Sequence, residues 1–79
     1  MVVKLSCIEN AKEFCKIVGS SQYKDIDIDL QCERYVIDAK SLLGILSVDL
    51  RKQMKVVFHG GKNDEIKFKN EIQKFLVNE

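Results

Sequence analysis

The run from residue 25 to residue 30 constrains the fold more than any other part of the chain. In Asp25-Ile26-Asp27-Ile28-Asp29-Leu30, acidic and aliphatic residues alternate strictly. Alternation with a period of two is typical of a β-strand that has one buried face and one face in water. The run therefore predicts a sheet that is covered on one side only, with its aspartates on the open side.

Three further strands are expected from short runs of apolar and β-branched residues. They lie at residues 2–7, 34–38 and 54–59, and the first places Cys7 on its inner face. Cys32-Glu33 lies between the run at 25–30 and the run at 34–38, which predicts a tight hairpin.

Apolar residues at helical spacing predict three helices. The first covers residues 10–18 and the second follows a cap at Ser41. The third begins at a cap on Asn63 or Asp64 and runs toward the C-terminus. The stripes expected to be buried on the first and third helices are Ala11, Phe14, Cys15 and Val18, and Phe68, Ile72, Phe75 and Leu76.

The resulting order is β-α-β-β-α-β-α. It predicts an α+β fold, an open-faced sandwich with a four-stranded antiparallel sheet and three helices on one face. Residues 1–79 are expected to form a single domain, because a chain of this length has room for only one core.

Composition and charge argue against several classes of function. The net charge of +1 offers no basic excess for a nucleic acid, and no apolar run is long enough to cross a bilayer. The three cysteines form no C-x-x-C pair and show no spacing typical of a metal site. The first residues lack the pattern of a signal peptide, so we expect a cytoplasmic protein with no metal and no cofactor.

The segment Ala39-Lys40-Ser41-Leu42-Leu43-Gly44-Ile45-Leu46-Ser47 carries a resemblance to a known family. It resembles the second-helix motif of the HPr family of the sugar phosphotransferase system. That motif reads Lys-Ser, two apolar residues, Gly, two apolar residues and Ser, and the order of the elements agrees as well. The resemblance implies the HPr-like sandwich and a carrier that takes phosphate from phosphoenolpyruvate through enzyme I. The implied partners are proteins: enzyme I-like proteins, transcriptional regulators and HPr kinase-like proteins.

The chain departs from the family where phosphate is carried. The family has Gly-x-His-x-Arg-Pro at the start of its first helix, whereas this chain has Cys7-Ile8-Glu9-Asn10-Ala11-Lys12-Glu13. Counting back from Ser41 without gaps puts Asn10 at the histidine position, and a one-residue gap puts Glu9 there. Lys12 stands near the arginine position. Since an amide nitrogen has no lone pair for attack, we expect no phosphohistidine at this site.

Other residues have a functional and a structural interpretation. His59 is the only histidine, but antiparallel pairing of its strand with the first would put it at the far end from the first helix's start. Ser41 is expected to cap a helix, and the resemblance suggests regulatory phosphorylation there, aided by Lys40. Leu43 and Leu46 are either core residues or a docking surface for partner proteins.

Three functional hypotheses follow. The leading one is an HPr-like regulatory or protein-binding module without catalytic activity of its own. The second is a divergent phosphocarrier that uses Glu9 or His59. The third is an unrelated ferredoxin-like domain that binds a ligand or assembles with itself.

Overall fold

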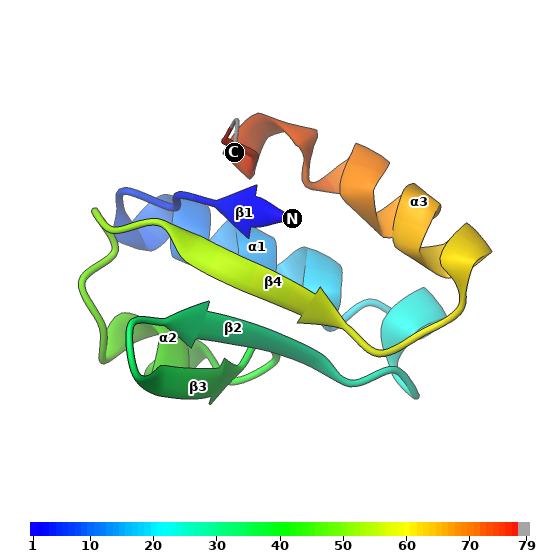
Figure 1. Cartoon of the computed structure of the whole chain (residues 1–79), viewed down its shortest axis with the longest axis horizontal. Helices are drawn as coiled ribbons and strands as arrows, with labels where there is room; N and C mark the ends of the chain where they lie inside the picture. Colours follow the sequence, from blue (N-terminus) through cyan, green and yellow to red (C-terminus); the bar gives the residue numbers. More distant parts are fainter. Residues whose placement is uncertain (78–79) are drawn as a thin grey trace.

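The computed structural model describes residues 1–77 and contains a four-stranded sheet with three α-helices (Figure 1). Short 3₁₀ turns follow α1 and α3, at Ser21–Tyr23 and Gln73–Phe75. The elements in chain order are β1 (Val2–Val3), α1 (Ile8–Val18), β2 (Ile28–Cys32), β3 (Tyr35–Asp38), α2 (Leu42–Leu46), β4 (Met54–Phe58) and α3 (Lys62–Glu71).

The strands lie in the order β1-β4-β2-β3, and each neighbouring pair is antiparallel. Because β1 and β2 are both antiparallel to β4, they run parallel to each other with β4 between them. In the same way β3 and β4 are parallel, with β2 between them. The chain therefore forms two interleaved split β-α-β units, one connected by α1 and the other by α2.

Alternate residues of the two central strands point into one core. Ile28, Leu30 and Cys32 are buried in β2, and Met54 and Val56 are buried in β4. Figure 1 shows α1 and α2 behind this sheet. The predicted α+β layout is confirmed: an open, antiparallel, four-stranded sheet with helices over one face.

Phe68 joins three parts of the core. Its ring contacts the rings of Phe14 in α1, Tyr23 in the turn after α1 and Phe58 in β4, with centroid separations between 5.2 and 6.3 Å. Each such aromatic pair adds about 0.5–1.5 kcal/mol beyond the apolar area that it buries. Because Phe68 is the one fully buried residue within α3, this cluster fixes α3 on the rest of the fold.

Two strand predictions are wrong at their ends. The first strand stops at Val3 instead of continuing to Cys7, because the chain turns at Ser6, where φ is 74° and the Cys7 N–H donates to Leu5 O at 2.9 Å. Cys7 is exposed as a result.

The alternating run joins the sheet only from Ile28. Residues 25–27 lie before β2, where the Ile26 N–H donates to Tyr23 O and extends the turn around the buried Tyr23 ring. The hairpin turn consists of Glu33 and Arg34 rather than Cys32-Glu33, since Cys32 pairs with Tyr35.

The helix predictions need smaller corrections. α1 begins at Ile8, two residues before the predicted start. α3 begins at Lys62 after Gly61 in extended conformation, so neither Asn63 nor Asp64 is its cap. α3 ends at Glu71, and the remainder of its predicted buried stripe lies at its C-cap, in the following 3₁₀ turn and just after it.

The segment after this turn covers the outer edge of β1. Lys4 N–H donates to Phe75 O at 3.0 Å, and Val77 N–H donates to Val2 O at 2.9 Å. Leu76 forms a β-bridge with Val3. The edge of the sheet at β1 is therefore occupied by the chain's own C-terminal segment.

Candidate functional site

The start of α1 is built by backbone contacts rather than by a side-chain cap. Cys7 is the extended N-cap residue, and its side chain makes no capping hydrogen bond. The Ser6 N–H donates to Leu50 O at 2.8 Å, which fixes this turn against the chain between α2 and β4. The first turn of α1 is thus held by the loop that precedes β4.

Glu9, Asn10 and Lys12, the residues expected near the position of the HPr family's phosphate site, differ in how exposed they are. The Asn10 side chain is half-buried, and its Nδ2 donates to Leu5 O at 2.7 Å. Glu9 and Lys12 are exposed on α1. Glu13, which follows, forms an ion pair with Lys74 on the surface. The amide of Asn10 therefore has a structural partner that no reading of the sequence indicated, since Leu5 was expected inside a strand.

His59 lies at the other end of the sheet. It follows the end of β4, and its Nε2 is 3.0 Å from Asp29 Oδ2. In Figure 1 the end of β4 lies at the right, whereas α1 begins at the left. β4 is antiparallel to β1, so the position expected for His59 is confirmed. The chain's one histidine is not brought to the start of α1.

Ser41 has the predicted capping role. Its Oγ accepts a hydrogen bond from the Gly44 N–H at 3.2 Å, and the residue is exposed. The Lys40 ammonium donates to the carbonyl oxygens of Tyr23 and Lys24 at 2.9 and 3.0 Å, and the help expected from it at a phosphorylated Ser41 stays a prediction. These two hydrogen bonds from Lys40 stabilise the turn after α1.

The leucines of α2 divide between the core and the surface. Ile45 is fully buried, whereas Leu43 is 83% exposed. Leu46 and Leu42 are half-buried and pack against the edge of the core. Of the two residues proposed for partner binding, Leu43 is exposed and can contact another molecule. Leu46 packs partly against the core and is partly exposed at the surface.

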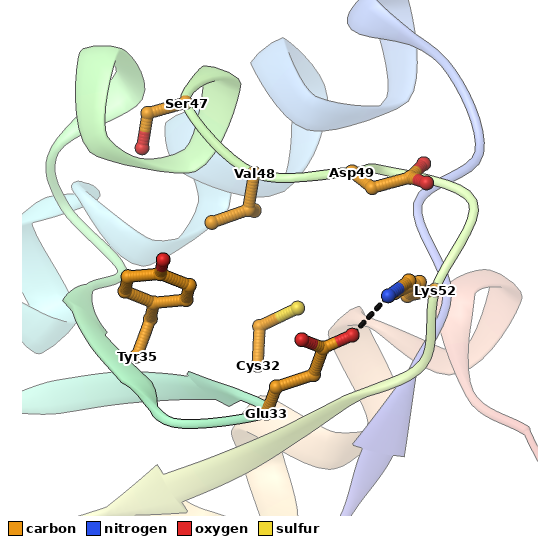
Figure 2. Close-up of a pocket in the computed structure, with 7 residues that line it drawn as sticks. All are labelled: Cys32, Glu33, Tyr35, Ser47, Val48, Asp49 and Lys52. Atoms are coloured by element: carbon orange, nitrogen blue, oxygen red, sulfur yellow. Dashed lines mark hydrogen bonds and ion pairs between the residues drawn. The ribbon is translucent and has the colours of Figure 1, made fainter.

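A cleft of about 300 Å³ lies next to the C-terminal end of α2 (Figure 2). One wall is the β2–β3 turn and the other is the loop from α2 to β4. Figure 2 shows the Tyr35 ring on the first wall and Val48 opposite it, with the Lys52–Glu33 ion pair at one end. The cleft is lined by Cys32, Glu33, Tyr35, Ser47, Val48, Asp49 and Lys52.

The charged groups of the cleft are paired. Arg51 donates from Nε and Nη2 to the two carboxylate oxygens of Asp49 at 3.0 Å, and its backbone N–H donates to Oδ1. These bonds lower the pKa of Asp49 to about 2. The hydrogen bond from Lys52 to Glu33 raises the pKa of the lysine. The cleft therefore presents two compensated ion pairs, Asp49–Arg51 and Glu33–Lys52, rather than a field of one sign.

No family model, curated protein or solved structure matches this chain.

The cleft was not predicted from the sequence. Its residues come from two segments, 32–35 and 47–52, that are brought together by the packing of α2 on β3 and by the Lys52–Glu33 ion pair. Apart from Ser47, which ends the motif at residues 39–47, neither segment carries a pattern that indicates a cleft.

Within the part of the chain that the structure describes, the cysteines form no disulfide and no metal site. Cys7, Cys15 and Cys32 are all free, and burial raises the pKa of the Cys15 thiol, with Asp38 adding to the shift. Among residues 1–77, no group of three or more His, Cys, Asp or Glu side chains is placed to hold a metal ion. Across the same part of the chain, none of the helices has the length and apolar character required to span a membrane.

Proposed function

We propose that this chain is an HPr-like regulatory module that binds partner proteins through α2 and does not carry phosphate on histidine. The observation that carries the proposal is the exposure of Leu43, at 83%, on a helix whose inner side packs on the core through the buried Ile45. The proposal includes a cytoplasmic setting and no catalytic activity of the chain's own.

The support begins with the way α2 is held. Ser41 caps its first turn, Gly44 lies against Ile37 of β3, and Ile45 is fully buried. A helix of only five residues is marginal without such contacts. Because its inner side is fixed, the outward Leu43 is presented in one orientation, and binding it costs little further ordering.

The second support is the state of Asn10, which an ungapped count puts at the family's histidine position, and of His59, the one histidine of the sequence. Asn10 offers an amide that already donates to Leu5 O, and an amide is not a nucleophile toward phosphate. His59 faces Asp29 at the opposite end of β4. A partner that docked at the start of α1 would find no imidazole within its reach.

Phosphotransfer is tested by incubating the chain with enzyme I and labelled phosphoenolpyruvate. We expect no stoichiometric label. An acid-labile label would show phosphohistidine at His59, and a label removed by hydroxylamine would show an acyl phosphate, with Glu9 as the candidate. Either result would overturn the non-carrier part of the proposal and favour the divergent phosphocarrier.

Partner binding is tested by following the amide resonances of the chain during titration with enzyme I, an HPr kinase-like protein and a transcriptional regulator of the system. We expect shifts at residues 42–47 with at least one of them. Leu43→Asp should weaken that binding by about tenfold or more, since an exposed apolar anchor is replaced by a charge. Ile66→Asp is the matched control, because Ile66 is also exposed but lies on α3.

The same titration tests a regulatory role of Ser41. An aspartate at position 41 keeps an oxygen acceptor for the Gly44 N–H, so Ser41→Asp should retain the cap while adding a negative charge beside Leu43. We expect an altered affinity with an unchanged fold. If neither Leu43→Asp nor Ser41→Asp changes the affinity of any of the three partners, α2 is not the docking element.

A further inference from the structure

The outer edge of β3 is an open sheet edge. In the sheet order β1-β4-β2-β3 formed by residues 1–77, β3 has only β2 as a neighbour. The opposite edge, at β1, is covered by the segment that follows α3. The Lys4 N–H donates to Phe75 O, and the Val77 N–H donates to Val2 O. Figure 1 shows no strand or helix of the described chain beyond β3 on the side away from β2. Such an edge presents unpaired backbone donors and acceptors to another strand.

The register shows which backbone groups point outward. Ala39 N–H donates to Ile28 O at 2.8 Å, so the odd-numbered residues of this segment direct their N–H and C=O groups toward β2. In an antiparallel ladder the residues between them direct these groups to the other side. Val36, in the middle of β3, therefore offers both its N–H and its C=O at the open edge.

The side chains near this edge are also exposed. Val36 is 65% exposed on the open face of the sheet, and Tyr35 is 58% exposed on the helical face. Arg34 precedes the strand and Asp38 ends it, and both are exposed. Asp38 Oδ1 accepts a hydrogen bond from the Lys40 N–H, which leaves Oδ2 for another donor.

Charge complementarity selects the partner. In an antiparallel pairing of β3 with a second β3 centred on Val36, each Val36 faces its counterpart across a two-fold axis. Positions 34 and 38 lie at equal distances on either side of Val36, so each Arg34 then faces Asp38 of the other copy. The same register exchanges two hydrogen bonds between the Val36 residues, and it places Tyr35 opposite Ile37 of the other copy.

We propose that the β3 edge pairs with the β3 edge of a second copy of this chain, in the register centred on Val36. The pairing is isologous, because the same residues act on both sides of the axis. It joins two four-stranded sheets into one and leaves α2 available for other partners. A strand of four residues buries less than the roughly 1,200 Å² of a stable complex, so the dimer is weak and reversible.

Sedimentation equilibrium from about 10 µM to about 1 mM tests the proposal. The mean mass should rise from that of one chain toward that of two. Val36→Lys places two ammonium groups on the axis and should keep the mass at that of one chain, whereas Ile66→Lys, an exposed apolar position on α3, should leave the rise unchanged. A mass of one chain throughout the range, or a dimer unaffected by Val36→Lys, overturns the proposal.

Charge variants test the register. Arg34→Asp sets two carboxylates opposite each other and Asp38→Arg sets two guanidinium groups opposite each other, so each variant alone should be monomeric. An equimolar mixture should form a heterodimer, and the double variant should dimerise again. Far-UV circular dichroism checks the fold of each. Dimers that form equally well in both single variants would overturn the register.

Hydrogen exchange gives a readout that does not depend on any substitution. At low concentration the amides of Ile37 and Ala39 should be protected by β2, whereas the amide of Val36 should exchange faster. At high concentration the Val36 amide should slow several-fold while the other two change little. Equal slowing of all three amides, or none at Val36, would contradict pairing at this edge.

Discussion

Gly44 of α2 lies so close to Ile37 of β3 that a Cβ atom on the glycine would stand 2.9 Å from Ile37 Cγ2. The same atom would stand 3.2 Å from Ser41 Oγ, the oxygen that caps the helix. The absence of a side chain at this position lets the short helix approach the edge strand. A residue that weakens a helix by propensity thus strengthens its packing here.

Gly44→Ala should therefore destabilise the fold. Alanine improves helix propensity by up to about 1 kcal/mol, but the contact with Ile37 forces a shift that costs about 1–3 kcal/mol. We expect a net loss of about 1 kcal/mol in the free energy of unfolding, measured by urea denaturation. Gly61→Ala is the control for the contact, because no described atom outside the adjacent residues lies within 4 Å of its Cβ position. Gly61 is the N-cap of α3, where glycine is preferred over alanine, so this change should lower stability through the cap and show no coupling to Ile37→Ala.

A double-mutant cycle with Ile37→Ala, which removes Cγ2, tests whether the contact with Ile37 causes the loss of stability in Gly44→Ala. The single Ile37→Ala change costs stability by leaving a cavity. In that background the added Gly44→Ala should cost less than it does in the native protein, with a coupling of about 1 kcal/mol. Strict additivity of the two changes would show that the contact is not the cause.

The hydroxyl of Tyr23 predicts a loss of stability in alkaline solution. Burial and the hydrogen bond from the hydroxyl to Glu71 Oε1, at 3.0 Å, raise the pKa of Tyr23 to about 12. In the unfolded chain the pKa is about 10. Between these values the unfolded state binds fewer protons than the folded state, so the free energy of unfolding falls as the pH rises. Below about pH 10 the contribution is fully present.

Absorbance at alkaline pH measures this titration directly. In a Tyr35→Phe background Tyr23 is the only tyrosine, so the tyrosinate signal belongs to it alone. The midpoint should lie near pH 12, and Glu71→Gln should lower it because the nearby negative charge is removed. Tyr23→Phe should flatten the fall in stability between about pH 10 and pH 12. A midpoint near pH 10 in folded protein would contradict the buried hydrogen bond.

Most of the architecture could be predicted because it rests on periodicity. The spacing of Phe14 and Val18 and the alternation around Ile28 and Leu30 depend on burial, which the sequence records directly. The layout of sheet and helices followed from these patterns. The prediction that Ser41 caps α2 is confirmed. It could be made from the sequence because a cap is a local contact, here between residues three positions apart.

The details that were wrong or not predicted depend on contacts between distant segments. Nothing near Ser6 in the sequence indicates a turn with positive φ, because its N–H is held by Leu50 O. The engagement of Lys40 by two carbonyls and the cleft beside Tyr35 arise only after the helices pack on the sheet. Such contacts leave no local pattern.

The turn at Ser6 stores backbone strain. Its φ of 74° and the hydrogen bond from the Cys7 N–H to Leu5 O describe a γ-turn, a conformation that is costly for residues other than glycine. Ser6→Gly should raise the free energy of unfolding by up to about 1 kcal/mol, after allowance for the greater freedom of glycine in the unfolded chain. Ser6→Val should lower it by at least about 1 kcal/mol, since a β-branched side chain tolerates this region least. Thermal unfolding of the pair checks both signs, and a less stable Ser6→Gly variant would contradict the strain.

The amide of Asn10 predicts that a change of one atom disturbs the start of α1. Asn10 Nδ2 donates to Leu5 O at 2.7 Å, and in Asn10→Asp a carboxylate oxygen would face that carbonyl instead. Loss of the bond and of the carbonyl's partner costs about 1–3 kcal/mol, and a favourable interaction of the new charge with the helix N-terminus returns about 0.3–1 kcal/mol. We expect a net loss of about 1 kcal/mol at pH 7 by urea denaturation.

The pH dependence separates this cause from a general weakening of the helix. A protonated aspartic acid can donate to Leu5 O, so the difference between Asn10→Asp and the native chain should shrink as the pH falls below about 4. Lys12→Ala, an exposed change on the same helix, should show neither the loss nor this dependence. If Asn10→Asp unfolds at the same urea concentration as the native chain at pH 7, the amide is not holding the first turn to Leu5.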